Sequence, residues 1–142
     1  MKVARTALRP LEKSARRAAA HAYSPYSNFC VGAAVLTESG KIFSGCNVEN
    51  ASFGLCNCAE RTAIFKAISA GEKKIKAVAI YTSTQTPTAP CGACRQVINE
   101  FGPDALVVSI CDSGERSETS LSALLPAAFG PESLRRNKAK RG

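Results

Sequence analysis

Two cysteine-bearing segments constrain this chain more than any other feature, because each stands at the start of a stretch with helical spacing. Cys91 and Cys94 lie in Pro-Cys-Gly-Ala-Cys at the beginning of a predicted helix over 91–101. Cys58-Ala-Glu opens a second predicted helix, over 58–70, and Cys58 precedes Cys91 by 33 positions. Residues three apart on a helix share a face, and the unpaired N–H groups of a helix N-terminus favour thiolates. If the fold sets the two helix N-termini side by side, three thiolates surround one zinc ion and leave its fourth position open.

A carboxylate follows the first of these cysteines by two positions. Glu60 projects from its helix in a different direction from Cys58, so it can face the open position without binding the metal, as a proton shuttle must. A ligand-x-Glu segment followed by Pro-Cys-x-x-Cys is the pattern of zinc deaminases, with cysteine allowed as the first ligand. The residues therefore predict one catalytic zinc per chain, bound by Cys58, Cys91 and Cys94, with Glu60 as the catalytic acid and base.

Three other uses of the cysteines stay open from the residues alone. Cys56 would complete a closed four-cysteine structural zinc site, although a spacing of two from Cys58 points the thiols to nearly opposite sides of a helix. Cys91 and Cys94 have the spacing of a thioredoxin-like redox pair, but that role leaves Glu60 unexplained. Any single cysteine can also pack as a small apolar side chain.

The cysteine and histidine counts restrict the compartment and the ligand set. Seven cysteines are an odd number, and the basic N-terminal segment has no continuous apolar stretch before a small-residue cleavage site, which disfavours a secretory signal. Thiols stay reduced in the cytosol, so we expect a cytoplasmic protein without a disulfide framework. No apolar run approaches the roughly 18 residues of a spanning helix, so no membrane partner is expected. His21 is the single histidine, so sulfur must supply most zinc ligands.

The formal charge of +8 belongs to the two ends of the chain. Residues 1–17 hold six basic side chains and one acidic one, residues 132–142 hold five and one, and the rest holds eight and nine. No aromatic residue lies among the C-terminal charges and Trp is absent, so stacking platforms for single-stranded nucleic acid are missing there. We expect a single domain over 1–142 with basic ends at about 1–9 and 135–142 as candidate flexible tails, and no nucleic-acid partner.

Helix-type and strand-type segments alternate along the chain. Apolar spacing predicts helices over 10–22, with Pro10 in the first turn, and over 58–70, 91–101 and about 121–125. Short apolar runs predict strands over 30–37, 41–46, 75–82, 105–110 and near Glu118. The segment Glu38-Ser39-Gly40 predicts a hairpin between the first two strands. This alternation indicates an α/β layered domain with a partly parallel sheet.

Five blocks resemble the small, homotetrameric cytidine deaminases and occur in that family's order and spacing. They are AYSPYSNFCVGAAVL (22–36), GCNVEN (45–50), CAERTAIFKA (58–67), PCGACRQV (90–97) and LLPAAFGPESL (124–134). The resemblance implies a three-layer α-β-α cytidine-deaminase-like fold with a mixed five-stranded sheet and zinc at two helix N-termini. It also implies a hydrolase of pyrimidine salvage that acts on a C–N bond of a cyclic amidine. Such an enzyme converts the nucleosides cytidine and 2′-deoxycytidine to the corresponding uridines and ammonia.

The resemblance also assigns substrate-binding roles, and it gives the three cysteines and the carboxylate the roles described above. Asn47 and Glu49 match a pair that hydrogen-bonds the ribose, and Phe29 matches an aromatic residue beside the pyrimidine. The backbone of Ala59 is expected to hold the base edge. Phe129 matches a residue that closes the site from a neighbouring subunit, which implies a homotetramer. Without the resemblance, the first two residues fit turn positions and the two aromatic residues fit a core.

Arg61 answers an electrostatic difficulty of this zinc site. Three thiolates lower the net charge of the zinc centre to −1, and a guanidinium hydrogen-bonded to the ligand sulfurs withdraws charge from them. The arginine of the Cys-Ala-Glu-Arg block has this place in the family that the chain resembles. The alternative is a surface arginine on the first helical turn.

Two positions depart from the usual wording of that family. Ala89 stands where a serine commonly precedes Pro-Cys, which removes a polar contact. Phe53 stands where tyrosine is common, which removes a phenolic hydroxyl near a subunit boundary.

Three rival functions follow from the same residues: deamination of RNA or single-stranded DNA, deamination of a cytosine-nucleoside antibiotic, and a non-catalytic zinc-stabilised module. Polynucleotide deaminases generally present His-x-Glu, whereas this chain has Cys58-Ala-Glu, and its Asn-Val-Glu-Asn segment suits a free ribose. That segment and Arg61 count against the antibiotic. Glu60→Ala separates an enzyme from a structural module.

Overall fold

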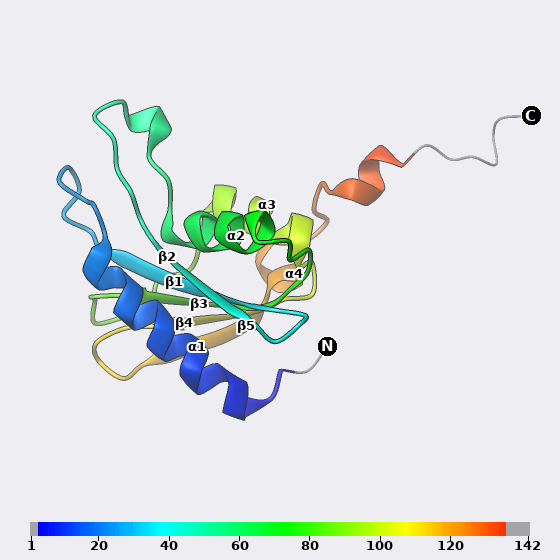
Figure 1. Ribbon diagram of the computed structural model, residues 1–142, viewed down its shortest axis with the longest axis horizontal. Helices are drawn as coiled ribbons and strands as arrows, with labels where there is room; N and C mark the ends of the chain where they lie inside the picture. The colour runs from blue at the N-terminus through cyan, green and yellow to red at the C-terminus, as the bar shows by residue number, and fades with distance from the viewer. Residues whose placement is uncertain (1–2, 136–142) are drawn as a thin grey trace, which may run out of the picture.

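The computed structural model describes residues 3–135, and this range contains a five-stranded sheet with helices on both faces (Figure 1). The strands are β1 (Val31–Thr37), β2 (Ile42–Cys46), β3 (Ile75–Thr82), β4 (Leu106–Ile110) and β5 (Arg116–Ser120). The α-helices are α1 (Arg5–Ala18), α2 (Ala59–Ser69), α3 (Gly92–Phe101) and α4 (Leu121–Leu124). Short 3₁₀ helices are η1 (Ala19–His21), η2 (Phe53–Leu55) and η3 (Pro131–Leu134).

The sheet is mixed, with the strand order β2-β1-β3-β4-β5. Strand β1 pairs antiparallel with β2 and β3, β4 pairs antiparallel with β5, and β3 runs parallel to β4 with Ala79 opposite Val108. A parallel pair needs a crossover connection, and α3 supplies it. The predicted hairpin joins β1 to β2, and Gly40 in its turn has φ +90°, a conformation that glycine adopts without a steric penalty.

Residues of the central strands alternate between two buried layers. In β1, Ala33 and Val35 pack against α2 and α3, whereas Ala34 and Leu36 pack against α1. Both faces of the sheet are therefore covered, which explains why these strands are nearly continuous in apolar residues. Figure 1 shows α1 below the sheet and α2 and α3 above it. The predicted three-layer α/β arrangement with a mixed five-stranded sheet is confirmed.

The first helix begins five residues earlier than predicted. Pro10 lies inside α1 rather than in its first turn. Its missing N–H leaves the carbonyl of Thr6 without a helical partner, but an earlier start buries Leu8 beside Leu11 against the sheet. The free energy gained by packing an amphipathic face outweighs the loss of one backbone hydrogen bond. The spacing of apolar residues alone does not predict this gain.

The same helix corrects the expectation of a flexible N-terminal end at about 1–9, because residues 5–9 belong to α1. Of the other expected tail, 135–142, residues 136–142 lie outside the described residues. The single domain over 1–142 stays a prediction. Between residues 3 and 135, no helix is both long enough and apolar enough to cross a membrane.

Candidate active site

The topology brings the two cysteine-bearing helix N-termini to one edge of the sheet. Strands β2 and β3 run in the same direction because both are antiparallel to β1. Helix α2 follows β2 and α3 follows β3, so both helices begin at the edge where these strands end. Cys58 is the N-cap residue of α2, Cys91 is the N-cap residue of α3, and Cys94 lies in the first turn of α3.

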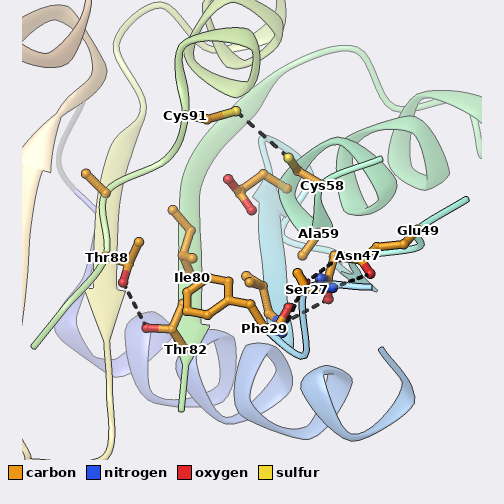
Figure 2. Close-up of a pocket in the computed structure, with 13 residues that line it drawn as sticks. Ser27, Phe29, Asn47, Glu49, Cys58, Ala59, Ile80, Thr82, Thr88 and Cys91 are labelled. Atoms are coloured by element: carbon orange, nitrogen blue, oxygen red, sulfur yellow. Dashed lines mark hydrogen bonds between the residues drawn. The ribbon is translucent and has the colours of Figure 1, made fainter. Parts of the chain in front are cut away.

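The three sulfurs lie as close together as the ligands of one metal ion. The Sγ atoms of Cys58, Cys91 and Cys94 are all within 4.8 Å of one another. The Sγ atoms of Cys58 and Cys91 are 3.8 Å apart, as drawn in Figure 2. Sulfurs about 2.3 Å from a tetrahedral zinc ion stand about 3.8 Å from each other. The donor set and this separation fit a zinc ion with three thiolate ligands.

A fourth cysteine ligand is not part of this cluster. The Sγ of Cys56 accepts a hydrogen bond from the backbone N–H of Asn50 at 3.3 Å, and Cys56 is not among the described residues whose ligand atoms come together. A site with three sulfurs keeps one coordination position for another ligand, which is the arrangement of catalytic rather than structural zinc. The closed four-cysteine alternative therefore finds no support in this geometry.

Arg61 is the positive charge beside the thiols. Its Nη2 donates a hydrogen bond to the Sγ of Cys58 at 3.3 Å, and its Nε is buried without a hydrogen-bond partner among the described residues. A hydrogen bond from the thiol of Cys94, together with the one from Arg61, lowers the pKa of Cys58 from 9.0 to about 5. The contact with Cys58 in turn raises the pKa of the guanidinium. The interpretation of Arg61 as a surface residue is therefore wrong in this structure.

Glu60 is the buried carboxyl group of the site. Only 4% of its surface is exposed, and its side chain lines the pocket described below. Burial raises the pKa of Glu60 above its ordinary value of 4.5. A buried carboxyl group with a raised pKa holds a proton more readily, which suits it to accept a proton and return it within one reaction cycle.

A pocket of about 230 Å³, partly open to solvent, joins the thiols to the residues predicted to hold a substrate. Its lining includes the sequence-predicted residues Phe29, Asn47, Glu49, Cys58, Ala59, Glu60 and Cys91. The structure therefore gathers most of the predicted site into a single cavity, as Figure 2 shows.

The two polar residues after β2 hold the loop that precedes β1. The Oδ1 of Asn47 accepts a hydrogen bond from Val31 N at 2.9 Å, and its Nδ2 donates to the carbonyl of Phe29 at 2.7 Å. The Oε1 of Glu49 accepts from the backbone N–H groups of Tyr26 and Ser27 at 2.9 and 3.1 Å. These contacts bridge separate segments, so both side chains do more than stabilise their own turn.

Two aromatic residues that the sequence analysis singled out, Phe129 and Phe53, do not line the pocket. Phe129 is 62% exposed and is not among the residues that line the pocket. Gln96 Nε2 fixes its position by donating to its carbonyl at 2.8 Å. Phe53 is 71% exposed and packs edge-on against Tyr26 with ring centroids 5.6 Å apart. Ala89, in contrast, lines the pocket.

Sequence reasoning did not find the remaining walls of the pocket, which are Ser27, Val31, Ile80, Thr82 and Thr88. Ile80 and Thr82 lie two apart in β3 and therefore face the same side of the sheet. Thr82 donates to Thr88 Oγ1 at 3.2 Å, which ties the end of β3 to the loop before Cys91. The signal that could have found them is the strand end directly before the Pro-Cys segment, since ligands commonly bind beyond the carboxyl ends of strands.

A layered α/β fold with three clustered thiols, two of which line a small-molecule pocket together with a buried carboxyl group, is the arrangement of a zinc-dependent enzyme. Residues 6–110 match the family model described as the cytidine and deoxycytidylate deaminase zinc-binding region. The chain is 49% identical over 120 residues to the cytidine deaminase of Sporosarcina psychrophila, covering 84% of this chain and 88% of that protein. It is 48% identical over 125 residues to the one of Halalkalibacterium halodurans, covering 87% and 95% of the two chains.

A solved structure agrees with these sequence matches. The 1.6 Å crystal structure of cytidine deaminase from Burkholderia pseudomallei superposes with a TM-score of 0.82 at 53% sequence identity. The superposition covers 85% of this chain and 98% of that one. The chain belongs to the zinc-binding cytidine and deoxycytidylate deaminase family.

Proposed function

We propose that this protein is a zinc-dependent cytidine deaminase that hydrolyses cytidine and 2′-deoxycytidine to uridine and 2′-deoxyuridine with release of ammonia. The observation that carries the proposal is a single pocket. It has the thiols of Cys58 and Cys91 and the carboxyl of Glu60 in one part, and Asn47 and Glu49 in another. A group for hydrolysis and polar groups for a sugar are thus presented to the same small molecule.

The chemistry rests on one metal and one carboxyl group. Cys58, Cys91 and Cys94 would hold a zinc ion, which would supply a Lewis acid that makes water a nucleophile near neutral pH. Glu60 accepts a proton from the attacking water and delivers it to ring N3 of the pyrimidine while the oxygen of that water bonds to C4. The second proton comes from the hydroxyl group now on C4 and moves through Glu60 to the amino group; the C–N bond breaks, ammonia leaves, and C4 becomes a carbonyl. The transfers are sequential, so one buried carboxyl group performs both.

The surrounding residues bind and orient the nucleoside. Phe29 lies beside the pyrimidine, the backbone of Ala59 holds the base edge, and Asn47 and Glu49 take the ribose hydroxyls. Arg61 offsets the negative charge of the three thiolates through its hydrogen bond to Cys58. The part of the chain between its basic ends is nearly neutral, which suits an uncharged nucleoside better than a polynucleotide.

Self-association as a homotetramer is part of the proposal. Large apolar side chains are exposed on the surface of this chain, including Tyr26, Phe53, Leu55 and Phe129. Exposed apolar side chains of this kind are typical of protein interfaces. Phe129 would then close the site of a neighbouring subunit. We also propose a cytoplasmic location, where the three thiols would stay reduced. Light scattering after gel filtration tests the assembly, and a fully active monomer would overturn it.

A matched pair of measurements on Glu60→Gln tests the function. Wild-type protein should convert cytidine to uridine, with a fall in ultraviolet absorbance, and should contain one zinc ion per chain. The amide keeps the size of Glu60 but removes the proton acceptor, so turnover should fall about 10²–10⁴-fold with the zinc content unchanged. Wild-type protein that leaves cytidine unchanged, or prefers a cytosine-containing oligonucleotide, would refute the proposal.

A further inference from the structure

Ser27 is a polar residue of the pocket to which the mechanism above gives no role. Its hydroxyl donates a hydrogen bond to Oε2 of Glu49 and accepts one from the backbone N–H of Phe29 at 3.0 Å. Its own backbone N–H donates to Oε1 of the same carboxylate at 3.1 Å. One residue therefore contacts both the carboxylate expected at the sugar and the aromatic residue expected at the base.

Hydrogen bonds fix the backbone of Phe29 at both its N–H group and its carbonyl group. The Phe29 carbonyl accepts from Asn47 Nδ2 at 2.7 Å, while the Phe29 N–H donates to the Ser27 hydroxyl. Between Ser27 and Phe29, Asn28 has φ +57°, a left-handed conformation that asparagine adopts more readily than most other non-glycine residues. The position of the aromatic ring thus depends on the residues that are proposed to bind the ribose.

The hydrogen-bond capacity of Glu49 decides how it can meet a sugar. An ionised carboxylate offers about four lone-pair positions. Backbone N–H groups of Tyr26 and Ser27 use Oε1, and the Ser27 hydroxyl uses one position on Oε2. The contact with Ser27 fixes the direction of the remaining lone pair on Oε2. This lone pair is the one left to accept a hydrogen bond from a hydroxyl group of the ligand.

The same contacts favour the ionised form of Glu49. The hydrogen bond from the Ser27 side chain is the largest cause and lowers its pKa below 4.5; desolvation opposes it, and the hydrogen bonds from the Ser27 and Tyr26 backbones add to it. These hydrogen bonds come from the loop before β1, and no charged side chain in the described part of the chain contributes to the shift. Ser27 therefore extends the ionised, hydrogen-bond-accepting form of Glu49 to lower pH.

We propose that Ser27 is a positioning residue that couples sugar recognition to base placement, because its one hydroxyl aims the Glu49 carboxylate and anchors the Phe29 backbone. The inference deepens the proposed function and rests on it. It makes the sugar hydroxyls and the base interdependent in binding: a nucleoside that engages Glu49 tightens the loop that carries the aromatic residue.

Ser27→Ala tests the coupling, and its exposed side chain can be removed without disturbing the core. Loss of a hydrogen bond to a charged group should raise the KM for cytidine about 10- to 100-fold, with a smaller effect on kcat. With 2′,3′-dideoxycytidine, which lacks the 2′- and 3′-hydroxyls and keeps only the 5′-hydroxyl of its sugar, the same substitution should cost much less in kcat/KM. Equal losses for the two nucleosides would overturn the coupling.

A second serine–glutamate pair provides the matched control. Ser39 donates to Oε2 of Glu72 at 2.8 Å in the hairpin turn, away from the pocket. Like Glu49, Glu72 has its pKa lowered chiefly by the serine hydrogen bond. Ser39→Ala should raise the pKa of Glu72 and leave both KM values unchanged, which separates a loss at the pocket from the general effect of losing a Ser–Glu contact.

A titration keeps this test independent of the proposed function. The ¹³C resonance of the Glu49 carboxyl, assigned by its loss in Glu49→Gln, should report a higher pKa in Ser27→Ala than in the wild type. The KM of Ser27→Ala should accordingly begin to rise at a higher pH as the solution is acidified. An unchanged Glu49 pKa would refute the role of Ser27 even in an active enzyme. Wild-type protein without cytidine deaminase activity would refute the proposed function, and the titration would still decide the geometry.

Discussion

Gly45→Ala should separate the stability of the fold from the placement of the site, because Gly45 is where β2 comes closest to α2. A Cβ atom at this position would lie 2.5 Å from the backbone nitrogen of Ala63, 2.9 Å from Cβ of Thr62 and 3.0 Å from the carbonyl oxygen of Ala59. Ordinary contacts of a Cβ atom begin at 3.4 Å, so the backbone of α2 must retreat by about 0.9 Å. All three obstructing atoms belong to α2, and two of them are backbone atoms that no rotamer change can move.

The size of the effect follows from that displacement. Overpacking of this kind costs about 1–3 kcal/mol, and each kcal/mol lowers the melting temperature of a domain this long by about 3–5 °C. Helix α2 carries Glu60 and begins directly after Cys58, so its retreat also moves one thiol of the cluster and the proposed proton shuttle. Misplacing reacting groups by about 1 Å costs on the order of 10²-fold in rate. We expect kcat to fall by about 10- to 100-fold even in the folded, zinc-loaded variant.

Two other glycines serve as controls in the same calorimetric, zinc and kinetic assays. A Cβ atom at Gly32 would lie 2.0 Å from the carbonyl oxygen of Ala15 and 2.5 Å from the nitrogen of Ala19, so it displaces α1 on the opposite face of the sheet. Gly32→Ala should lose stability and keep its turnover per folded chain. Gly54 has no atom within 4 Å of such a Cβ, so Gly54→Ala should resemble the wild type. A Gly45→Ala protein with the stability and turnover of the wild type would refute the argument.

Three further outcomes are expected. Arg61→Met should raise the pKa of the Cys58 thiol by removing its cationic partner and weaken zinc binding about 10- to 100-fold in competition with a chelator; unchanged affinity would contradict this. Removal of zinc by a chelator should abolish turnover and lower the melting temperature, and readdition of Zn²⁺ should restore both; activity that survives chelation would exclude a zinc enzyme. Hydrogen bonds from Tyr81 and Ser83 lower the pKa of Asp112, so this carboxylate stabilises the fold above its unfolded pKa of about 3.8 and loses that effect as pH falls through the lower folded value. Asp112→Asn should flatten the stability curve in that acidic range, and parallel curves would argue against the contact.

The residues of the zinc cluster could be predicted because they lie at short, characteristic spacings within two contiguous segments. Cys58, Glu60 and the Pro-Cys-Gly-Ala-Cys segment each stand at a helix start, and the structure places Cys58 and Cys91 as N-cap residues. The spacing within each segment determines which side chains share a helix face, so each half of the site could be predicted from its own segment. Only the contact between the two segments depended on the fold.

Features that depend on tertiary contacts could not be predicted in the same way. The start of α1 was placed at Pro10, because local propensity disfavours proline inside a helix, whereas burial of Leu8 carries the helix back to Arg5. Thr82 carries no local motif, and the block that contains Ser27 assigned this serine no role; both line the pocket because of how strands and loops are paired. Phe129 matches a known pattern, yet a single chain leaves it outside the cavity.

Strand direction explains why residues spread from position 27 to position 91 form one site. Because β1 is antiparallel to both β2 and β3, the edge at which β2 and β3 end is the edge at which β1 begins. Phe29 comes just before β1, Asn47 just after β2, Thr82 at the end of β3, and Cys58 and Cys91 before the following helices. The hairpin between β1 and β2 was predicted, so the pairing of β1 with β3 was the missing fact. With that one pairing known, the segments that carry Asn47, Phe29 and the thiols could have been assigned to a common edge from sequence alone.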